Sequence, residues 1–409
     1  MSTDTLTRAA APARPRPLVT HGAGFWVVGW AFLVAMAFST VPTPLYAIYQ
    51  ARDGFPTYVV TIVFASYAVG VSASLYLAGH LSDWFGRRPV VLIALLTEVL
   101  SAAVFLLWQS VPALVVARFV GGLGIGVLTA TATAHLAELN ATARPGRGRR
   151  AVTVATGVNL GGLAVGPLIG GVLAQYVTRP LETPYAIFLV LLVVSALAVA
   201  VVPETVERPA ERPAYRPQQV RLPGETRSTF AAAAVGAAAA FSVMGLFMSL
   251  APTVLAGTLH VTSRLAAGAV AFSVLAAATV AQLALGGLTP RRQLSIGLVV
   301  MPAGLVLIAA SVAAAVTWLF VAGAVVAGVG LGLVFKAAAA TAAGLAAPQA
   351  RGETMAAFFL IAYVGLAVPV LLIGAALSQF ETRPVVLVFT AVVGVAVVGA
   401  GLKVLRALR

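Results

Sequence analysis

Three ionisable side chains lie inside long apolar stretches of this 409-residue chain, where a free charge would have no water around it. Glu98 is about ten residues from either end of its stretch, so a helix would carry it about 15 Å inwards. Arg118 lies in the next stretch, ahead of a run of glycines, and Lys336 lies in a later one. A carboxyl group whose proton affinity depends on its neighbours can bind and release protons, and an arginine can polarise it. We therefore predict a proton-coupling site made of Glu98 and Arg118.

Each of the three side chains also has a structural explanation, and both explanations stay open at this point. Glu98 could be a protonated, hydrogen-bonded side chain inside a helix bundle. Arg118 could extend to the outer surface, about two helical turns away. Lys336 could face a central cavity, where it would bind an anion or compete for the proton, or it could extend to the opposite surface.

The remaining composition excludes most catalytic chemistry. The chain has no cysteine, so disulfides, thiolate metal sites and cysteine nucleophiles are excluded. Its four histidines lie far apart without metal-ligand spacing, and we see neither a nucleophile–base pair nor an ATP-binding P-loop. We therefore expect no enzyme activity, no metal and no cofactor, and any energy coupling must come from an ion gradient.

The elements that carry these residues are apolar runs of membrane-spanning length. Sixty per cent of the residues are hydrophobic and nine per cent are charged, against about 25% charged in soluble domains. A spanning helix needs about 20 apolar residues. Twelve candidate runs cover residues 25–49, 58–78, 90–108, 113–137, 151–176, 186–202, 230–255, 265–285, 296–315, 318–343, 354–377 and 384–402. We predict an all-α membrane protein with twelve transmembrane helices and a lipid bilayer as its surroundings.

The basic residues give these helices an orientation. Twenty of the 26 lysines and arginines fall in the two tails and the segments on one side, and only four fall in the loops on the other. Positive charge gathers on the cytoplasmic side, so both termini are predicted to be cytoplasmic. The net charge of +14 is therefore a topology signal, and we expect no nucleic-acid partner.

The chain also repeats itself weakly between its halves. Pro-Thr follows the first run at Pro42 and the seventh at Pro252, and Gly-Leu-Ala-Val recurs at 162–165 and 365–368. Two related six-helix bundles with a substrate site between them are the arrangement expected for such repeats. The predicted divisions are a cytoplasmic tail (1–22), a first bundle (23–202), a Pro/Arg/Glu-rich cytoplasmic linker (203–228), a second bundle (229–403) and a final tail (404–409).

A basic loop between the second and third runs carries the most specific motif. Residues 79–88 fit the pattern G-x-L-[AS]-D-x-x-G-R-[RK], and the candidate functional residues in it are Gly79, Asp83, Gly86, Arg87 and Arg88. This pattern resembles the signature between helices two and three of the major facilitator superfamily. The resemblance implies the major facilitator fold and transport by alternating access. It also implies that the loop is a cytoplasmic latch.

Two acids look like partners for this loop, namely Glu138 at the end of helix 4 and Glu204 after helix 6. The corresponding loop of the second half keeps a basic pair at Arg291 and Arg292 but lacks the acid, so the latch should be asymmetric. A positive-inside loop with an incidental acid is the structural alternative.

Helix 5 carries the pattern G-x-x-x-G-P-x-x-G-G at Gly162, Gly166, Pro167, Gly170 and Gly171. It resembles the motif of the family's antiporters and is the main reason to favour export over import. The glycines permit tight helix contact and the proline kinks the helix, which ordinary packing would also explain.

The substrate cavity is predicted to be mostly apolar, with a few polar side chains. Its candidate wall residues are Phe38, Tyr46, Asn159, Phe241, Met244, Phe247, Gln282 and Lys336.

Within the family, the chain is most similar to the twelve-helix drug–proton antiporters of bacteria. The resemblance implies export of small lipophilic compounds in exchange for protons from the bacterial cytoplasmic membrane, by a protein we expect to be a monomer. The alternatives are a proton symporter for a sugar or organic acid, and a non-transporting membrane sensor.

Overall fold

The computed structural model describes residues 19–78, 81–206, 224–347 and 350–408. These residues form helices and no strand, and twelve of the helical stretches are long and apolar enough to cross a membrane. The predicted all-α membrane fold is therefore confirmed for the described part of the chain. The predicted tail 1–22 and linker 203–228 lie mostly outside it.

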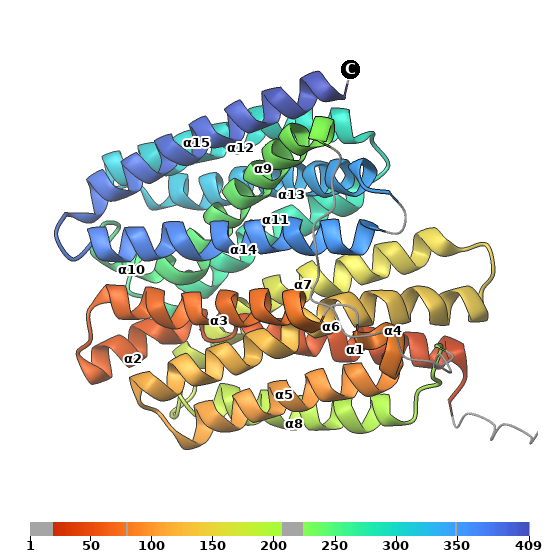
Figure 1. The fold of residues 1–409 in the computed structure, drawn as a ribbon. Coiled ribbons are helices and arrows are strands. Elements are labelled where there is room, and N and C mark those ends of the chain that lie inside the picture. Colours follow the sequence, from red (N-terminus) through yellow and green to blue (C-terminus); the bar gives the residue numbers. More distant parts are fainter. Residues whose placement is uncertain (1–18, 79–80, 207–223, 348–349, 409) are drawn as a thin grey trace, which may run out of the picture.

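The first six spans form one bundle, shown from red to yellow-green in Figure 1. They consist of α1 (His21–Thr40) with η1 (Thr43–Leu45) and α2 (Tyr46–Asp53), then α3 (Thr57–Ala78), α5 (Arg87–Leu107), α6 (Val111–Ala143), α7 (Gly148–Tyr176) and α8 (Thr183–Ala200). The short helix α4 (Leu81–Phe85) precedes α5.

The last six spans form a second bundle beside the first (Figure 1). They consist of η2 (Gly224–Thr226) with α9 (Arg227–Gly245), η3 (Leu246–Leu250) and α10 (Ala251–Gly257), then α11 (Arg264–Ala284), α12 (Pro290–Ala314), α13 (Thr317–Leu345), α14 (Arg351–Ala376) and α15 (Thr382–Ala407). The bundles meet where α7 packs on α11 and where α3 packs on α14. We call the side with α4 and the C-terminus the terminal side, and the opposite side, with α2 and α10, the distal side (Figure 1).

Prolines interrupt the first span of each bundle. Pro42 and Pro44 divide the first span into α1, a 3-10 turn and α2, because a proline cannot donate a helical hydrogen bond. The seventh span contains a π-turn, η3, just before Pro252 in α10. Both irregular turns lie in the protein interior, which is where broken backbone is tolerated at membrane depth.

Small residues allow the helices to approach closely. Gly70 of α3 faces Gly122 of α6, where a side chain on either would meet the other helix's backbone. In the second bundle, Gly304 of α12 lies against Ala327 of α13. Helices in lipid associate through such contacts because apolar burial alone gives them little advantage.

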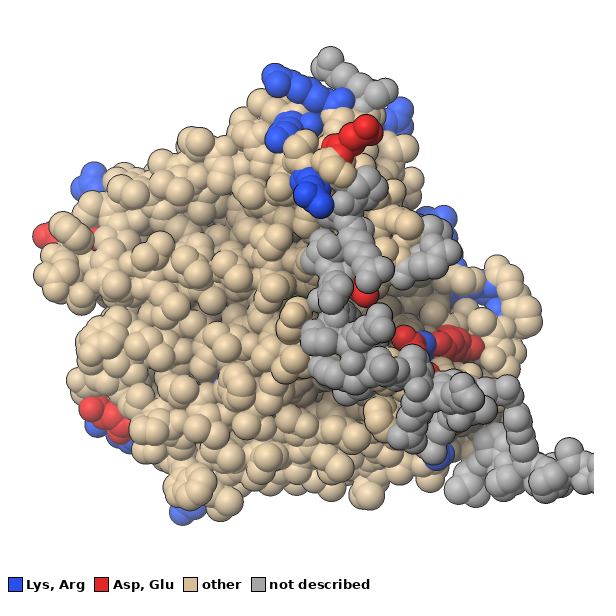
Figure 2. Space-filling model, viewed as in Figure 1, with Lys and Arg blue, Asp and Glu red and all other residues tan. Residues whose placement is uncertain are grey.

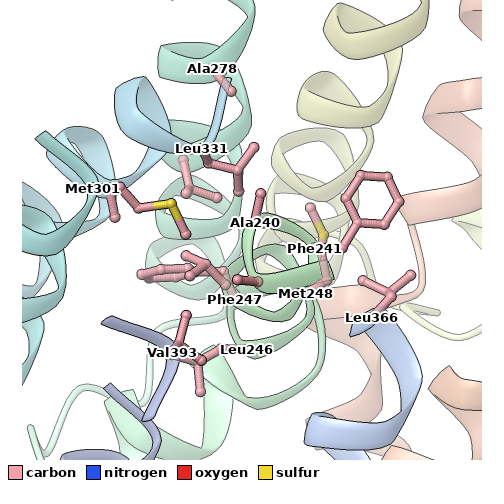
Figure 3. Close-up of a cluster of buried hydrophobic side chains, with 14 of the residues drawn as sticks. Ala240, Phe241, Leu246, Phe247, Met248, Ala278, Met301, Leu331, Leu366 and Val393 are labelled. Carbon is pink, nitrogen blue, oxygen red and sulfur yellow. The ribbon is translucent and has the colours of Figure 1, made fainter. Parts of the chain in front are cut away.

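Large apolar side chains fill the interior and also cover the outside. Figure 3 shows the interior of the second bundle, where Phe247, Met301 and Leu331 lie together. Exposed leucines and valines line the outer faces of the helices, and charged side chains gather at the two ends of the molecule (Figure 2). An apolar band between charged ends is the surface that a bilayer requires.

Candidate functional site

A cavity of about 540 Å³ lies between the two bundles. Its wall is formed by α1, η1, α3, α6 and α7 of the first bundle and by α9, η3, α11, α13 and α14 of the second. The position between two related bundles is the one expected for a substrate site.

The cavity is accessible from the terminal side. Its wall reaches Thr133, Val152 and Gly352, which are exposed near the terminal ends of their helices. At its inner end, the Thr43 hydroxyl lies 3.6 Å from the sulfur of Met248, and both residues are buried.

The distal side of the bundle interface is closed by direct contacts. Gly171 of α7 lies against Gly268 of α11, where a side chain on Gly171 would meet α11 backbone. The Arg264 guanidinium donates a hydrogen bond to the Ala174 carbonyl at 3.1 Å, and the Arg264 backbone N–H donates one to the side-chain oxygen of Gln175 at 3.1 Å. Arg264 could not be predicted from the sequence, because a basic residue at the start of a helix carries no pattern that points across an interface.

Three of the predicted wall residues line the cavity in the structure. Asn159, Met244 and Gln282 all line it. Met248 and Phe335 add further apolar surface, and Met side chains adapt readily to different ligands.

Five predicted wall residues do not line this cavity. Phe38 packs against Phe105 and Phe188 inside the first bundle, and Tyr46 is buried nearby. Phe247 points into the second bundle, on the opposite side of α9 and η3 from Met248 (Figure 3). The sequence could not predict on which face of its helix each of these side chains lies, because every face of these helices is hydrophobic.

The other two lie next to residues of the wall, with Phe241 buried and Lys336 half-buried. Phe241 is covered by Phe335 and Tyr363, with ring centroids 5.1 and 5.3 Å away. The Lys336 ammonium donates a hydrogen bond to the Gln282 carbonyl at 2.7 Å, near the C-terminal end of α11. A cation at a helix C-terminus interacts favourably with the helix dipole.

Arg118 is the only charged side chain among the described residues that line the cavity. One guanidinium nitrogen donates a hydrogen bond to the Ser39 carbonyl at 2.6 Å. The guanidinium carbon lies 4.3 Å from the centre of the Tyr67 ring and 5.9 Å from that of Phe64. Aromatic rings stabilise a desolvated cation at such distances, so Arg118 is held in place without a carboxylate.

Glu98 is fully buried between α5 and α6 and does not line the cavity. Its carboxyl group lies against Gly121 and Gly124, and a side chain at Gly124 would collide with it. Neither carboxyl oxygen has a hydrogen-bond partner among the described residues. Arg118 is close enough to act on the charge of Glu98, but the two form no ion pair. The structure therefore brings the two predicted residues near each other, but only Arg118, on α6, lines the cavity.

The glycines of the motif at residues 162–171, which lies on α7, face two directions. Gly162, Gly166 and Gly170 lie against α1, whereas Gly171 faces α11 across the bundle interface. Pro167 cannot donate to the Leu163 carbonyl four residues earlier, and the Thr40 hydroxyl donates to it instead, at 3.0 Å. Thr40 lines the cavity and was missed by the sequence analysis, because its partner is far away in the chain.

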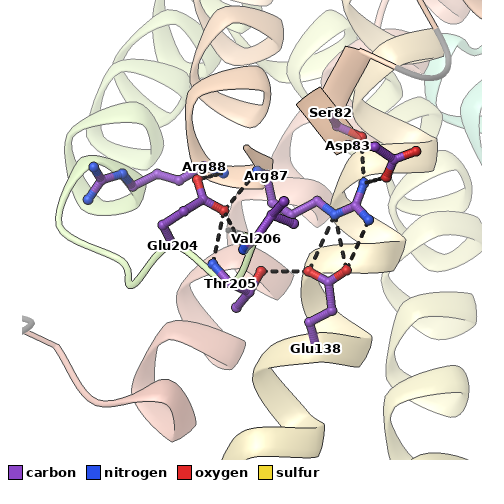
Figure 4. Close-up of polar contacts among 8 residues, drawn as sticks. All are labelled: Ser82, Asp83, Arg87, Arg88, Glu138, Glu204, Thr205 and Val206. Carbon is purple, nitrogen blue, oxygen red and sulfur yellow. Dashed lines mark hydrogen bonds and ion pairs between the residues drawn. The ribbon is translucent and has the colours of Figure 1, made fainter. Parts of the chain in front are cut away.

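Arg87 is the centre of the predicted latch, shown in Figure 4. Its guanidinium pairs with Glu138 at 3.0 Å and with Asp83 at 2.6 Å, and it also donates to the Ser82 hydroxyl at 2.7 Å. All of these partners belong to the first bundle, as do those of Arg88, which donates to the Val202 carbonyl. Gly79 lies outside the described residues.

Glu204 accepts hydrogen bonds from the backbone N–H groups of Arg87 and Arg88, at 2.9 and 3.1 Å (Figure 4). It therefore caps the N-terminus of α5, where a negative charge is favoured. Gly86 makes this possible, because its φ is +98° and a side chain there would collide with the Glu204 carboxylate. The Thr205 hydroxyl also donates to Glu138, at 2.6 Å, and the buried His135 ring contacts the Pro203 carbonyl.

Comparison with known proteins identifies the fold. A family model described as Major Facilitator Superfamily matches residues 27–294. The nucleoside transporter NupG aligns over 93% of this chain and 99% of its own with a TM-score of 0.70 and 12% identity. The human organic anion transporter MFSD10 (TETRAN) aligns over 97% of this chain and all of its own, with a TM-score of 0.68 and 17% identity.

The curated relatives match shorter parts of the chain. The arabinose-proton symporter of Bacillus subtilis is 38% identical over 19% of this chain. The tetracenomycin C resistance and export protein of Streptomyces glaucescens is 35% identical over 27% of it, and the cephamycin export protein CmcT of Amycolatopsis lactamdurans is 32% identical over 36% of it. The matched regions span 17%, 20% and 30% of the lengths of these three relatives.

Proposed function

The chain belongs to the major facilitator superfamily, and from this premise we propose that it exports small, largely apolar molecules in exchange for protons. Members of the family are transporters, and the substrate is carried through the cavity between the bundles. The proposed location is the bacterial cytoplasmic membrane, with the terminal side in the cytoplasm as the arginine distribution indicates.

The cavity wall favours a neutral or anionic substrate. Most of its surface is apolar, its amides come from Asn159 and Gln282, and its one charged group is the Arg118 cation. A cationic substrate would meet an uncompensated positive charge at low dielectric, whereas a carboxylate or enolate would pair with it. Two relatives are named as export proteins, for tetracenomycin C and cephamycin, which supports the export direction.

The conformation fits the loading step of an exporter. With the terminal side in the cytoplasm, the accessible cavity receives its substrate from the cytoplasm, and the Arg264 and Gly171 contacts close the outer side. Rocking of the bundles would then open the distal side.

The unpartnered Glu98 carboxyl group is the observation that carries the proton-coupling proposal. A buried carboxylate without hydrogen bonds or a counter-ion is costly, so this group holds a proton until a rearrangement offers it a partner. Glu98 contacts α6, which also carries Arg118 in the cavity wall. Substrate movement against Arg118 can therefore change the surroundings of Glu98.

The test is proton flux in inverted membrane vesicles that are acidified inside, followed with a pH-quenched dye. The probes are ethidium as a lipophilic cation, chloramphenicol as a neutral compound, nalidixic acid as an organic acid and arabinose as a sugar. We expect chloramphenicol or nalidixic acid to make the lumen alkaline in the wild type and not in Glu98→Gln. The matched control is Glu182→Gln, which removes an exposed carboxylate on the distal side.

Two outcomes would overturn parts of the proposal. A response that survives in Glu98→Gln would place coupling elsewhere. A response to arabinose alone would favour the symporter alternative, which the similarity to an arabinose-proton symporter keeps in view.

A further inference from the structure

Three tyrosines at the distal end of the first bundle are buried with their hydroxyl groups unsatisfied. Tyr46, Tyr49 and Tyr185 are each at most 2% exposed. None of their hydroxyls makes a hydrogen bond of ordinary geometry among the residues that the structure describes, although the Tyr49 and Tyr185 hydroxyls lie close enough to interact with each other. Tyrosine hydroxyls normally find a partner when buried, so three neighbouring exceptions need a common explanation.

The three tyrosines connect the distal surface with the proposed proton site. At the surface, Arg52 pairs with Asp53 at 2.6 Å, bonds to Gln109 and lies 5.3 Å above the Tyr49 ring. The Tyr49 and Tyr185 hydroxyls are neighbours.

Further in, the Tyr185 ring is held by stacking on Phe105, with centroids 4.5 Å apart. Tyr46 lies within electrostatic range of Arg118, which in turn acts on Glu98.

Buried polar atoms at the inner end, near Glu98, also lack hydrogen-bond partners in the described part of the chain. Arg118 Nε and both carboxyl oxygens of Glu98 also lack partners among the described residues. An ordered water typically makes about three hydrogen bonds and is found where buried polar groups are otherwise unsatisfied. These six atoms are among the eight unpartnered buried polar atoms in the described part of the first bundle, and such a group of atoms is the signature of bound water.

We propose that Tyr46, Tyr49 and Tyr185 hold a file of water molecules that carries protons between the distal surface and Glu98. The inference rests on the proposed proton coupling. Each water or hydroxyl in the file accepts one proton and donates another, and the Glu98 carboxylate accepts the last one to become a neutral acid. None of the three tyrosines lines the substrate cavity, so the proposed proton path and the substrate route meet only near Arg118.

Infrared difference spectroscopy on the full-length protein in lipid tests the proposal without any substrate. The infrared band of the Glu98 carboxyl group is assigned by its loss in Glu98→Gln. After the protein is mixed with D₂O, the time course of the shift of this band gives the rate at which the carboxyl proton is replaced by deuterium. In Tyr46→Phe, Tyr49→Phe, Tyr185→Phe and the triple variant, the rings remain and only the hydroxyls go. We expect the replacement of the Glu98 proton by deuterium to slow by about tenfold in a single variant, which is the effect of one lost hydrogen bond. It should slow by more in the triple variant.

The matched controls are Tyr363→Phe, in the cavity wall, and Tyr176→Phe, which is exposed; both should exchange at the wild-type rate. The wild-type rate in all three single variants would overturn the proposal, as would slowing in Tyr363→Phe alone, which would place the path through the cavity. If the triple variant does not fold, the single variants decide. Because no transported compound is needed, failure of the proposed export would leave this result readable.

Discussion

The Thr40 hydroxyl donates to the Leu163 carbonyl, which is the one that Pro167 leaves without its helical donor. The second bundle contains the same arrangement, in which the Ser242 hydroxyl donates at 2.8 Å to the Gly365 carbonyl, four residues before Pro369. Donor and acceptor are 123 residues apart in both cases. The two proline kinks are therefore stabilised by equivalent hydroxyls, on the first helix of each bundle.

Replacing Thr40 with valine should leave the Leu163 carbonyl unsatisfied. We expect the free energy of unfolding to fall by about 1–3 kcal/mol, the cost of a buried unpaired acceptor. Unfolding in mixed detergent micelles measures this. Thr97→Val is the matched control, because its exposed hydroxyl bonds only within its own helix.

Adding Pro167→Ala to Thr40→Val should recover part of the loss, since alanine restores the backbone donor for Leu163. The double variant is expected to be more stable than the sum of the two single effects by about 1 kcal/mol. Additive effects would show that the hydroxyl does not compensate for the proline.

Glu204→Gln should destabilise the terminal end of the first bundle. The carboxylate caps α5 through two backbone N–H groups, and loss of a cap costs about 0.5–2 kcal/mol. Hydrogen exchange of the α5 N-terminal amides, read by mass spectrometry, should accelerate. Glu225→Gln, an exposed acid at the start of the second bundle, should leave these amides unchanged.

Arg264→Gln should weaken the distal closure, because it removes the hydrogen bond to the Ala174 carbonyl. The native chain has no cysteine, so cysteines for spin labelling can be introduced at Val177 and Thr262 without removing any native cysteine. We expect a larger population of long distances between the labels than in the wild type. Arg179→Gln, whose partner Glu182 is in the same bundle, should give the wild-type distribution, and a matching result for Arg264→Gln would contradict the proposed role.

Gln282→Glu should reverse the charge preference of the cavity. A carboxylate in its wall offsets Arg118, so binding of ethidium should strengthen by about tenfold and binding of nalidixic acid should weaken by a similar factor. Fluorescence titration of the purified protein measures ethidium, and competition measures the acid. Gln379→Glu, at an exposed distal position, is the control.

The sequence predicted elements far better than it predicted which way their side chains point. The twelve spans, the Arg87–Glu138 pairing and the burial of Glu98 all follow from charge in apolar surroundings, which has few solutions in a membrane. Phe38 and Phe247 were misplaced because an all-apolar helix has no face that its sequence distinguishes. Thr40 and Arg264 were missed because their partners are backbone carbonyls, which no side-chain pattern reveals.

The two bundles differ in the kinds of side chain that they bury. Every fully buried Glu, Arg, His and Tyr among the described residues belongs to the first bundle, whereas the second contributes mainly Ala, Val, Leu and Phe to its interior. Selection for a new substrate can therefore repack the second bundle through apolar exchanges, each tolerated on its own. Variants recovered under such selection should accumulate in the second half of the chain and keep the energy source of their parent.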